Sequence, residues 1–424
     1  MLQLTTIRQE TDTIIERLKL RGIDAKDAIH ALLSADESNR KLRFELEQNQ
    51  AKANQLAGEI GQLYKSGQRE LADQKKVESF NLKELIKNQE EDLTLSDNKV
   101  RDLLVSLPNA PQLDVPAGKD AEDNQTVLEW GEHPQLHAEA KPHWELASEL
   151  GIIDFELGVK ITGAGFPVYK GKGAILQRAL IQFFLNEAGK EGYTEMQVPH
   201  LVNADSGYGT GQLPDKEGQM YHAGLDDLYL IPTAEVPVTN LYRNTLLDHS
   251  QLPVKNTAYT PCFRREAGSY GAHVRGLNRL HQFDKVEIVQ IVKPQDSDQT
   301  LEQMQNYVQG LLQKLGLPYR LLLLCGGDMG FTSAKTYDLE VWSAAQERWL
   351  ECSSVSNFET FQTNRLKCRF RNEEGKTELA HSLNGSALAL PRIVAALLEN
   401  NQDEKGIRIP DVLVPYTGFD RIDR

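Results

Sequence analysis

TPCFRREAGSYGAHVRGLNRLHQFDKVEI, residues 260–288, carries the densest set of binding groups in this chain. A short apolar and aromatic run at its start and an alternating run over 280–288 flank a glycine-rich loop. Two strand-like runs about such a loop predict an antiparallel hairpin with a long tip. Four arginines lie in or beside the loop: Arg264, Arg265, Arg275 and Arg279. Because arginine suits bidentate binding of phosphate or carboxylate, we expect the hairpin to hold a nucleoside triphosphate without a P-loop.

A family resemblance rests on this hairpin. The runs FRREAG (263–268) and HQFDKVE (281–287), with Arg279 between them, resemble motif 2 of the class II aminoacyl-tRNA synthetases, which would span about 257–288 here. In particular, they resemble the bacterial seryl-tRNA synthetases, and the likeness extends from the first helical segment to the end of the chain. Short motifs alone are weak signals, so a likeness over the whole chain is more specific than motif 2 by itself.

Bulk composition is that of an ordinary globular chain. Its 424 residues allow two or three domains, with 40% hydrophobic and 25% charged residues. A net charge of −14 argues against nucleic-acid binding through overall charge but allows a local basic path. Four distant cysteines and ten scattered histidines show no ligand spacing, so no zinc is expected. Without a membrane-length apolar run or a signal-peptide pattern, we expect a cytoplasmic protein with no membrane partner.

The first 105 residues differ from the rest, with little Gly or Pro and long helical periodicity. Two mainly apolar series step by four and three residues, and Ser66-Gly67 separates them. The series are Leu42, Leu46, Asn49, Ala53, Leu56, Ile60 and Leu63, then Leu82, Ile86, Gln89, Leu93, Ser96, Val100, Leu103 and Leu107. This spacing predicts two long helices in an antiparallel coiled coil that projects as an arm.

The pattern alone leaves the role of the arm open, because dimerisation is the commoner use of such heptads and no basic stripe is visible. The resemblance implies that the arm lies against the long variable arm of a tRNA. RNA duplexes are recognised largely by shape and backbone, which suits a mixed-charge rod. The side chains expected at the tRNA are Arg40, Arg43, Lys52, Lys65, Lys76 and Lys83, with Ser269 and Tyr270 of the motif 2 loop.

Three prolines mark the expected domain boundary. Pro108, Pro111 and Pro116 end the helical region and open a linker. We therefore predict an N-terminal tRNA-binding domain over 1–110 and a catalytic domain over 111–424.

The resemblance implies an α+β catalytic domain in which helices flank a mainly antiparallel sheet. Motif 1, about 163–199, is expected to contain a long helix and a strand from Thr194 to Val198, closed by Pro199. In the family this motif builds the dimer interface, so a homodimer is expected. The pattern by itself also fits an ordinary core helix.

Two segments, Thr233-Ala234-Glu235 and Glu287 of motif 2, are implied to line a serine pocket. Residues 233–235 lie between prolines and would by themselves be a plain turn. In the seryl enzymes the matching loop closes over serine. A Glu complements the ammonium group there, and a Thr offers both a donor and an acceptor.

Motif 3, about 381–400, supplies the remaining pocket residues. The resemblance places Asn384 and Ser386 on a strand at the serine, and Arg392 at the start of the following helix, against adenine and triphosphate. Ala387 and Pro391 stand where the family motif has glycines. Proline is tolerated at a helix start, so the fold is expected to survive.

Glu351 and Ser354 are expected to end a strand and to hold Mg²⁺ with the ATP phosphates, although a lone Glu at a strand end is usually just exposed. Magnesium favours oxygen ligands and needs few from the protein when phosphates supply the rest. The residues implied at ATP are Arg264, Arg265, Glu266, Arg279, Phe283, Glu351, Cys352, Ser353, Ser354 and Arg392.

The resemblance also implies individual roles in catalysis. Arg264 would bridge the serine carboxylate and the α-phosphate, and Glu287 and Arg392 would complete the catalytic set. Glu266 would bind the adenine amino group and Phe283 would stack on the ring.

The implied reaction is that of an ATP-dependent, AMP-forming serine–tRNA ligase. L-Serine would be activated to seryl-adenylate and transferred to tRNA(Ser), with tRNA(Sec) as a second expected substrate. Three alternatives remain: another class II synthetase, a related ligase that charges a carrier protein, and a non-enzymatic coiled-coil binding protein. The arm and the Thr-Ala-Glu with Asn-Gly-Ser combination argue against the first alternative. The arm alone argues against the second, and the intact Arg and Glu sites argue against the third.

Overall fold

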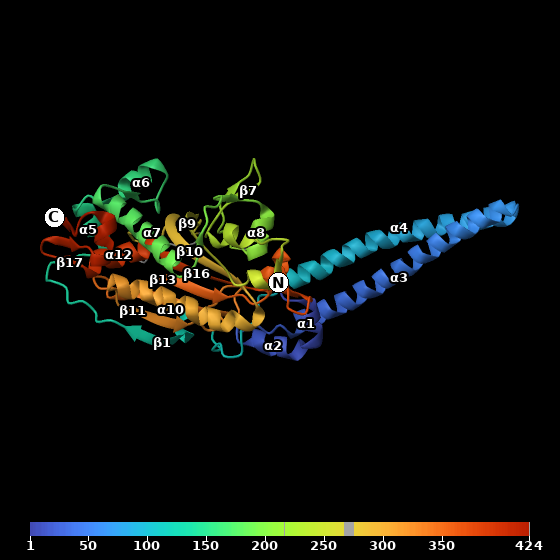
Figure 1. Ribbon diagram of the computed structural model, residues 1–424, viewed down its shortest axis with the longest axis horizontal. Helices are drawn as coiled ribbons and strands as arrows, with labels where there is room; N and C mark the ends of the chain where they lie inside the picture. The colour runs from blue at the N-terminus through green and yellow to red at the C-terminus, as the bar shows by residue number, and fades with distance from the viewer. Residues whose placement is uncertain (216, 267–274, 424) are drawn as a thin grey trace. The chain divides into compact units, whose positions relative to one another are not determined.

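The computed structural model describes residues 1–215, 217–266 and 275–423, drawn in Figure 1. The chain divides into two compact units. One comprises Leu2–Lys19 and Ile23–Pro108, and the other comprises Met1, Leu20–Gly22 and Asn109–Arg424.

The first unit is helical. Its helices are α1 (Leu4–Gln9), α2 (Thr11–Lys19), α3 (Lys26–Lys65) and α4 (Arg69–Ser106). The long helices α3 and α4 run antiparallel and are joined at Ser66-Gly67, where Gly67 adopts a φ of 78° that favours glycine. The predicted two-helix arm is confirmed, and α3, with 40 residues, is about 60 Å long.

The heptad series form the interface between α3 and α4. Every position of the two predicted series is buried or half-buried, whereas most of the residues between them are exposed. Polar members of the series pair across the interface: Asn49 Nδ2 donates to Gln89 Oε1 at 2.9 Å. Such half-buried polar pairs specify register, because a shifted pairing would separate the two partners.

The second unit is built on an eight-stranded sheet that is antiparallel except where β4 pairs with β9. In spatial order its strands are β1 (Gln125–Trp130), β11 (Tyr319–Leu323), β12 (Lys335–Ser343), β13 (Arg348–Asn357), β16 (His381–Ala389), β10 (Gln282–Val292), β9 (Val254–Phe263) and β4 (Thr194–Glu195). The predicted α+β class with a mainly antiparallel sheet is confirmed.

Three helices cover the apolar face of this sheet (Figure 1): α7 (Lys172–Lys190), α10 (Ser297–Leu315) and α12 (Leu390–Asn400). Alternate residues of the central strands, such as Ile288, Val355 and Leu383, point to these helices and are fully buried. The intervening residues therefore share the opposite face, where the polar side chains gather.

Smaller elements complete the second unit. The helices are α5 (His143–Glu149), α6 (Phe155–Ile161), α8 (Ala204–Thr210), α9 (Glu235–Asn240), α11 (Phe361–Leu366) and α13 (Val414–Thr417). The strands are β2 (Ile153–Asp154), β3 (Val168–Tyr169), β5 (Leu201–Val202), β6 (His222–Ala223), β7 (Leu228–Leu230), β8 (Leu246–Asp248), β14 (Arg369–Arg371), β15 (Thr377–Leu379), β17 (Gln402–Asp403), β18 (Gly406–Arg408) and β19 (Arg421–Asp423).

The structure corrects three local predictions. The motif 1 strand, predicted from Thr194 to Val198, covers only Thr194–Glu195, and Pro199 cannot donate to extend the pairing. Glu351 and Ser354 lie within β13 rather than at its end, because the strand continues to Asn357. Glu235, predicted in a turn, is the first residue of α9. No helix in the described parts of the chain is long and apolar enough to span a membrane.

Candidate active site

The predicted motif 2 hairpin is formed by β9 and β10, and it joins motif 3 through the pairing of β10 with β16. Glu287 lies opposite Ser386, and Val289 lies opposite Asn384. Since directly opposed residues of antiparallel strands share a face, Glu287, Ser386 and Asn384 all belong to the polar face.

A carboxylate pair lies on this face at the predicted serine pocket. The Thr233 hydroxyl donates to Glu287 Oε2 at 3.4 Å, and its Oγ1 accepts from the Glu235 backbone N–H at 3.2 Å. Gln362 of α11 donates to Glu235 Oε1 at 2.6 Å, and Asn384 also hydrogen-bonds to Glu235. Thr233, Glu235, Glu287 and Asn384 are therefore brought together in one buried cluster.

The two carboxylates differ in their surroundings. Burial raises the pKa of Glu235 to about 7, and the nearby negative charge of Glu287 adds to the shift, against the hydrogen bond from Gln362. Glu287 instead has a cation beside it, because Lys285 Nζ lies 2.5 Å from its Oε2. The pocket thus holds one carboxylate that forms an ion pair with a lysine and one whose pKa is raised to about 7.

Next to this cluster lies a cavity of about 230 Å³. It is lined by Arg264, Glu266, Leu277, Asn278, Arg279, Leu280, Phe283, Lys285, Glu351, Cys352, Ser353, Ser386, Ala389, Pro391 and Arg392. Residues of motif 2, motif 3 and β13 therefore meet at one place. Of the residues predicted at ATP, Arg265 and Ser354 do not line this cavity, and Arg265 is exposed.

Several predicted ATP residues contact one another. The Arg264 guanidinium carbon lies 5.2 Å from the centre of the Phe283 ring, and Arg279 forms an ion pair with Glu266. Arg392 donates from Nη1 to the Glu351 carbonyl at 3.3 Å. Burial lowers the pKa of Arg392, while the Glu351 carboxylate acts in the opposite direction.

A bulge in β13 shapes the predicted magnesium position. Ser354 lies opposite Asp338 and Glu351 opposite Glu340, with a register shift between them. In an uninterrupted strand, residues 351 and 354 would face opposite sides, but the extra residue at the bulge brings both to the polar face. The bulge residue is Cys352, whose side chain is buried in the core.

The residues at this position fit a hard cation. Glu351 offers an exposed carboxylate and Ser354 a hydroxyl, and the buried Asp338 Oδ1 has no hydrogen-bond partner among the described residues. Burial raises the pKa of Asp338 well above its usual range, Glu351 adds to the shift, and Ser354 opposes it. Mg²⁺ selects such oxygen donors, and a bound cation would favour the ionised form of the Asp338 carboxyl.

Two further residues that were predicted at the substrates, Ala234 and Ser353, make their contacts within the protein. The Ala234 side chain lies in an apolar cluster with Val238, Ala258 and Val289. Ser353 donates its hydroxyl to the Ser386 carbonyl at 2.6 Å, which ties β13 to β16.

The basic residues predicted at the tRNA are exposed along α3 and α4. Four of them have acidic neighbours: Arg40 with Asp36, Arg43 with Asp97, Lys52 with Glu78 and Lys76 with Asp73. Lys65 and Lys83 are exposed as well. Ser269 and Tyr270 lie outside the described residues.

Sequence reasoning missed three residues of this site. Lys285 stands two positions before Glu287, and Asp338 stands in the alternating run KTYDLEV, so period-two spacing was an available signal for both. Gln362 comes from α11, far along the chain from Glu235, and nothing in the local sequence marks it.

Comparisons with known proteins agree with this geometry. Residues 220–401 match the family model "tRNA synthetase class II core domain (G, H, P, S and T)", and residues 1–111 match "Seryl-tRNA synthetase N-terminal domain". The antiparallel sheet with its three motifs thus defines a class II aminoacyl-tRNA synthetase.

Relatives narrow this class further. The serine–tRNA ligase of Salinibacter ruber is 51% identical over 424 residues, covering 100% of this chain and 99% of the relative, and that of Akkermansia muciniphila is 46% identical over 100% and 99%. The crystal structure of seryl-tRNA synthetase from Pyrococcus horikoshii complexed with ATP is 33% identical, with a TM-score of 0.92 and coverage of 100% and 99%. The chain belongs to the seryl-tRNA synthetase family, as its sequence predicted.

Proposed function

We propose that this chain activates L-serine with ATP to seryl-adenylate and pyrophosphate, and then transfers the seryl group to the terminal ribose of tRNA(Ser). The main support for the proposal is that two binding sites, a carboxylate cluster and an arginine-lined cavity, adjoin each other on one face of the sheet. The Glu235 and Glu287 cluster suits a small ammonium-bearing substrate, and it adjoins a cavity lined by three arginines.

Serine would bind by its ammonium group to Glu287 and Glu235. Thr233, Asn384 and Ser386 offer hydroxyl and amide groups at the same cluster, where a substrate hydroxyl could be paired. A pocket that pairs with a substrate hydroxyl rejects an analogue lacking it by about 10⁴-fold or more. Alanine should therefore be refused without a separate editing site.

ATP would occupy the adjoining cavity. Phe283 offers its ring to adenine, Glu266 accepts from the adenine amino group, and the guanidinium groups of Arg264, Arg279 and Arg392 bind phosphates. Because the attacking serine carboxylate is already an anion, the site needs no strong general base. Catalysis comes from positioning and from charge stabilisation at the α-phosphate, with Arg264 placed between the two substrates.

Glu351 and Ser354 would hold Mg²⁺, with Asp338 behind them. When bound, the ion would neutralise phosphate charge. The carboxylate of Glu351 and the hydroxyl of Ser354 would fix its place relative to Arg392, which already contacts the Glu351 carbonyl.

The arm formed by α3 and α4 would bind the long variable arm of tRNA(Ser), and tRNA(Sec) would be charged by the same route. The arm offers exposed basic side chains at intervals on both helices, such as Arg43, Lys65 and Lys83. We propose that the reaction takes place in the cytoplasm.

A homodimer is proposed through the motif 1 region. Support comes from two apolar side chains that α6 exposes on one face just before motif 1: Leu157 is 38% exposed, and Ile161, four residues further along, is 73% exposed. Contiguous exposed apolar side chains mark interaction surfaces. Sedimentation equilibrium at micromolar concentration tests this directly, and a strictly monomeric active enzyme would exclude it.

The decisive test of function is ATP–pyrophosphate exchange across the standard amino acids, followed by charging of tRNA(Ser). Exchange should depend on serine and be at background with alanine, threonine and proline. Exchange with a different amino acid, or charging of a carrier protein in place of tRNA, would overturn the proposal.

A further inference from the structure

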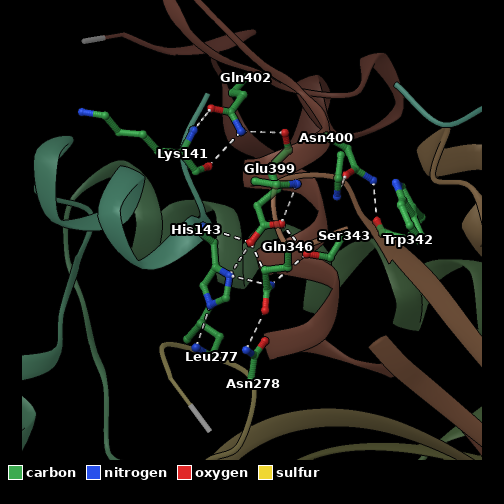
Figure 2. Close-up of polar contacts among 12 residues, drawn as sticks. Lys141, His143, Leu277, Asn278, Trp342, Ser343, Gln346, Glu399, Asn400 and Gln402 are labelled. Atoms are coloured by element: carbon green, nitrogen blue, oxygen red, sulfur yellow. Dashed lines mark hydrogen bonds and ion pairs between the residues drawn. The ribbon is translucent and has the colours of Figure 1, made fainter. Parts of the chain in front are cut away.

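A buried polar network centred on His143 and Glu399, neither of which lines the ATP cavity, holds the return leg of the motif 2 loop, residues 275–278. His143, the first residue of α5, accepts at Nε2 a hydrogen bond of 2.8 Å from the Leu277 backbone N–H. On its other side, His143 Nδ1 lies 2.7 Å from Glu399 Oε1 of α12. Figure 2 shows His143 between these two partners, and both the His143 and Glu399 side chains are fully buried.

These contacts assign the tautomer of His143. Because the Leu277 N–H is a donor, Nε2 must present its lone pair, so Nδ1 carries the proton and donates to Glu399. Glu399 also accepts from the His143 backbone N–H at 3.0 Å and from Gln346 Nε2 at 2.9 Å. Burial raises the pKa of Glu399, but its hydrogen bonds, with that from His143 the largest, hold the pKa below its usual value.

The neighbours of Leu277 are held in the same region. The Arg275 guanidinium lies 5.1 Å from the centre of the Trp144 ring, and Asn278 Nδ2 donates to Gln346 Oε1 at 2.9 Å. Gly276 has a φ of 66°, and a Cβ there would approach His143 Nε2 to 2.4 Å. Four consecutive residues thus lie against the start of α5 and the turn between β12 and β13. Leu277 and Asn278 also line the ATP cavity, together with the next two residues, Arg279 and Leu280.

The far end of the network belongs to motif 3. Glu399 follows Arg392 by seven residues on α12, which is two helical turns and places both on one side of the helix. His143 therefore hydrogen-bonds on one side to the loop that carries Arg279 and on the other side to the helix that carries Arg392.

We propose that His143 and Glu399 are positioning residues, which fix the return leg of the motif 2 loop relative to the motif 3 helix and thereby set the place of Arg279 in the ATP cavity. Neither lines that cavity, and His143 acts through the Leu277 backbone. The inference rests on the proposed function, because Arg279 is there assigned to the ATP phosphates.

Two substitutions of His143 separate its two contacts. His143→Gln places a side-chain oxygen near the Nε2 position and keeps an acceptor for the Leu277 N–H. His143→Asn has a shorter side chain, which can still donate to Glu399 but no longer reaches the Leu277 N–H. Since a small misplacement of a substrate-positioning group costs up to about 10²-fold, His143→Asn should raise KM for ATP by about 10- to 100-fold. His143→Gln should stay within about threefold of wild type. KM for serine should stay within about twofold for both.

Tyr319→Phe is the matched control for loss of buried hydrogen bonds. Tyr319 is fully buried, accepts from Gln313 at 2.8 Å and donates to Gln309 at 2.9 Å, with no hydrogen bond to residues 275–278, the described part of the loop. The Tyr319→Phe variant should have a lower melting temperature than the wild type and an unchanged KM for ATP. Gln346→Ala, on the half-buried turn, provides a variant that breaks the Asn278 contact should His143→Asn not fold.

The outcomes separate the two proposals. Absence of serine-dependent exchange in the wild-type enzyme would overturn the proposed function itself. An active wild type with unchanged KM for ATP in His143→Asn or Gln346→Ala would overturn only the positioning role. Equal rises in KM for ATP and for serine, or equal damage by His143→Gln and His143→Asn, would also overturn it, since both would indicate general loss of structure.

Discussion

Lys285 places its ammonium group 2.5 Å from the carboxylate of Glu287, and both side chains are buried at the proposed serine pocket. A buried charge that loses its partner is strongly destabilising. We therefore expect Lys285→Met to lower the free energy of unfolding by about 3–5 kcal/mol, measured by urea denaturation.

The double variant Lys285→Met with Glu287→Gln, compared with the two single variants, forms a double-mutant cycle that measures the coupling between the two side chains. Removing both charges should recover most of the lost stability, because no unpaired charge remains. Serine-dependent exchange should stay low in the double variant, since the proposed ligand of the substrate ammonium is gone. Purely additive stability losses would show that the two side chains are not coupled.

Arg264→Ala should nearly abolish serine-dependent ATP–pyrophosphate exchange. Arg264 lines the cavity beside Phe283 and is the group proposed to bridge the serine carboxylate and the α-phosphate. Loss of one such electrostatic contact lowers kcat by about 10²- to 10³-fold. Arg371→Ala, an exposed arginine on β14, should leave exchange unchanged. Near-normal exchange by Arg264→Ala would remove this residue from its proposed role.

The titration of Glu235 predicts how serine binding depends on pH. Its pKa is raised to about 7 from 4.5, first by burial and then by Glu287. Folding is thus favoured by this group at low pH, and that contribution is lost as pH rises from about 4.5 through 7. The ammonium group of serine needs the ionised form, so KM for serine should fall by about tenfold between pH 6 and 8.

Glu235→Gln supplies the control for this pH dependence. It cannot ionise, so its KM for serine should be higher than that of wild type at pH 8 and nearly flat from pH 6 to 8. Relative to wild type, its thermal stability should improve as pH rises, because the wild type then carries a buried charge. A wild-type KM that does not change over this range would contradict the assignment.

Local patterns predicted the strands and helices of the site because each pattern is set by a short stretch. The alternation before Glu287, the proline at the start of α12 and the four–three spacing of α3 and α4 all act within a few residues. The roles assigned to Arg264 or Asn384 came from family resemblance, since arginine or asparagine on a strand has many other uses.

Features that depend on distant pairing were not predictable from the sequence. The bulge at Cys352, which turns Glu351 and Ser354 to one face, is a property of β12 and β13 together. The contact of Gln362 with Glu235 and that of His143 with Glu399 join segments more than a hundred residues apart. Such pairs become visible only when the fold brings the segments together.

Glu351→Gln tests the proposed magnesium position. Removing the exposed carboxylate should raise the Mg²⁺ concentration for half-maximal exchange by at least about tenfold. Binding of Mn²⁺ in the presence of ATP, followed by electron paramagnetic resonance, reports the same loss without turnover. Glu340→Gln is the matched control, because Glu340 lies beside Glu351 in the sheet register but is paired with Arg320. An equal effect of both substitutions would argue for general electrostatics over ligation.

Removal of the arm should separate the two steps of the reaction. Asn39 Nδ2 lies 3.2 Å from Ser96 Oγ across α3 and α4, so a short Gly-Ser loop replacing residues 40–95 can connect the helices there without altering their spacing. Serine-dependent exchange should remain within about twofold of wild type, while KM for tRNA(Ser) should rise by at least about 10²-fold.

The charge pattern of the arm predicts how it binds. Arg40, Arg43, Lys52 and Lys76 each have a carboxylate within 4 Å, so phosphates must compete with acidic side chains of the protein. Few counterions are then released, and the affinity for tRNA should depend only weakly on salt, as expected for recognition of duplex shape. A steep salt dependence that disappears on removal of the arm would instead indicate binding through many phosphate contacts. Unaltered charging of tRNA(Ser) by the shortened enzyme would exclude an RNA-binding role for α3 and α4.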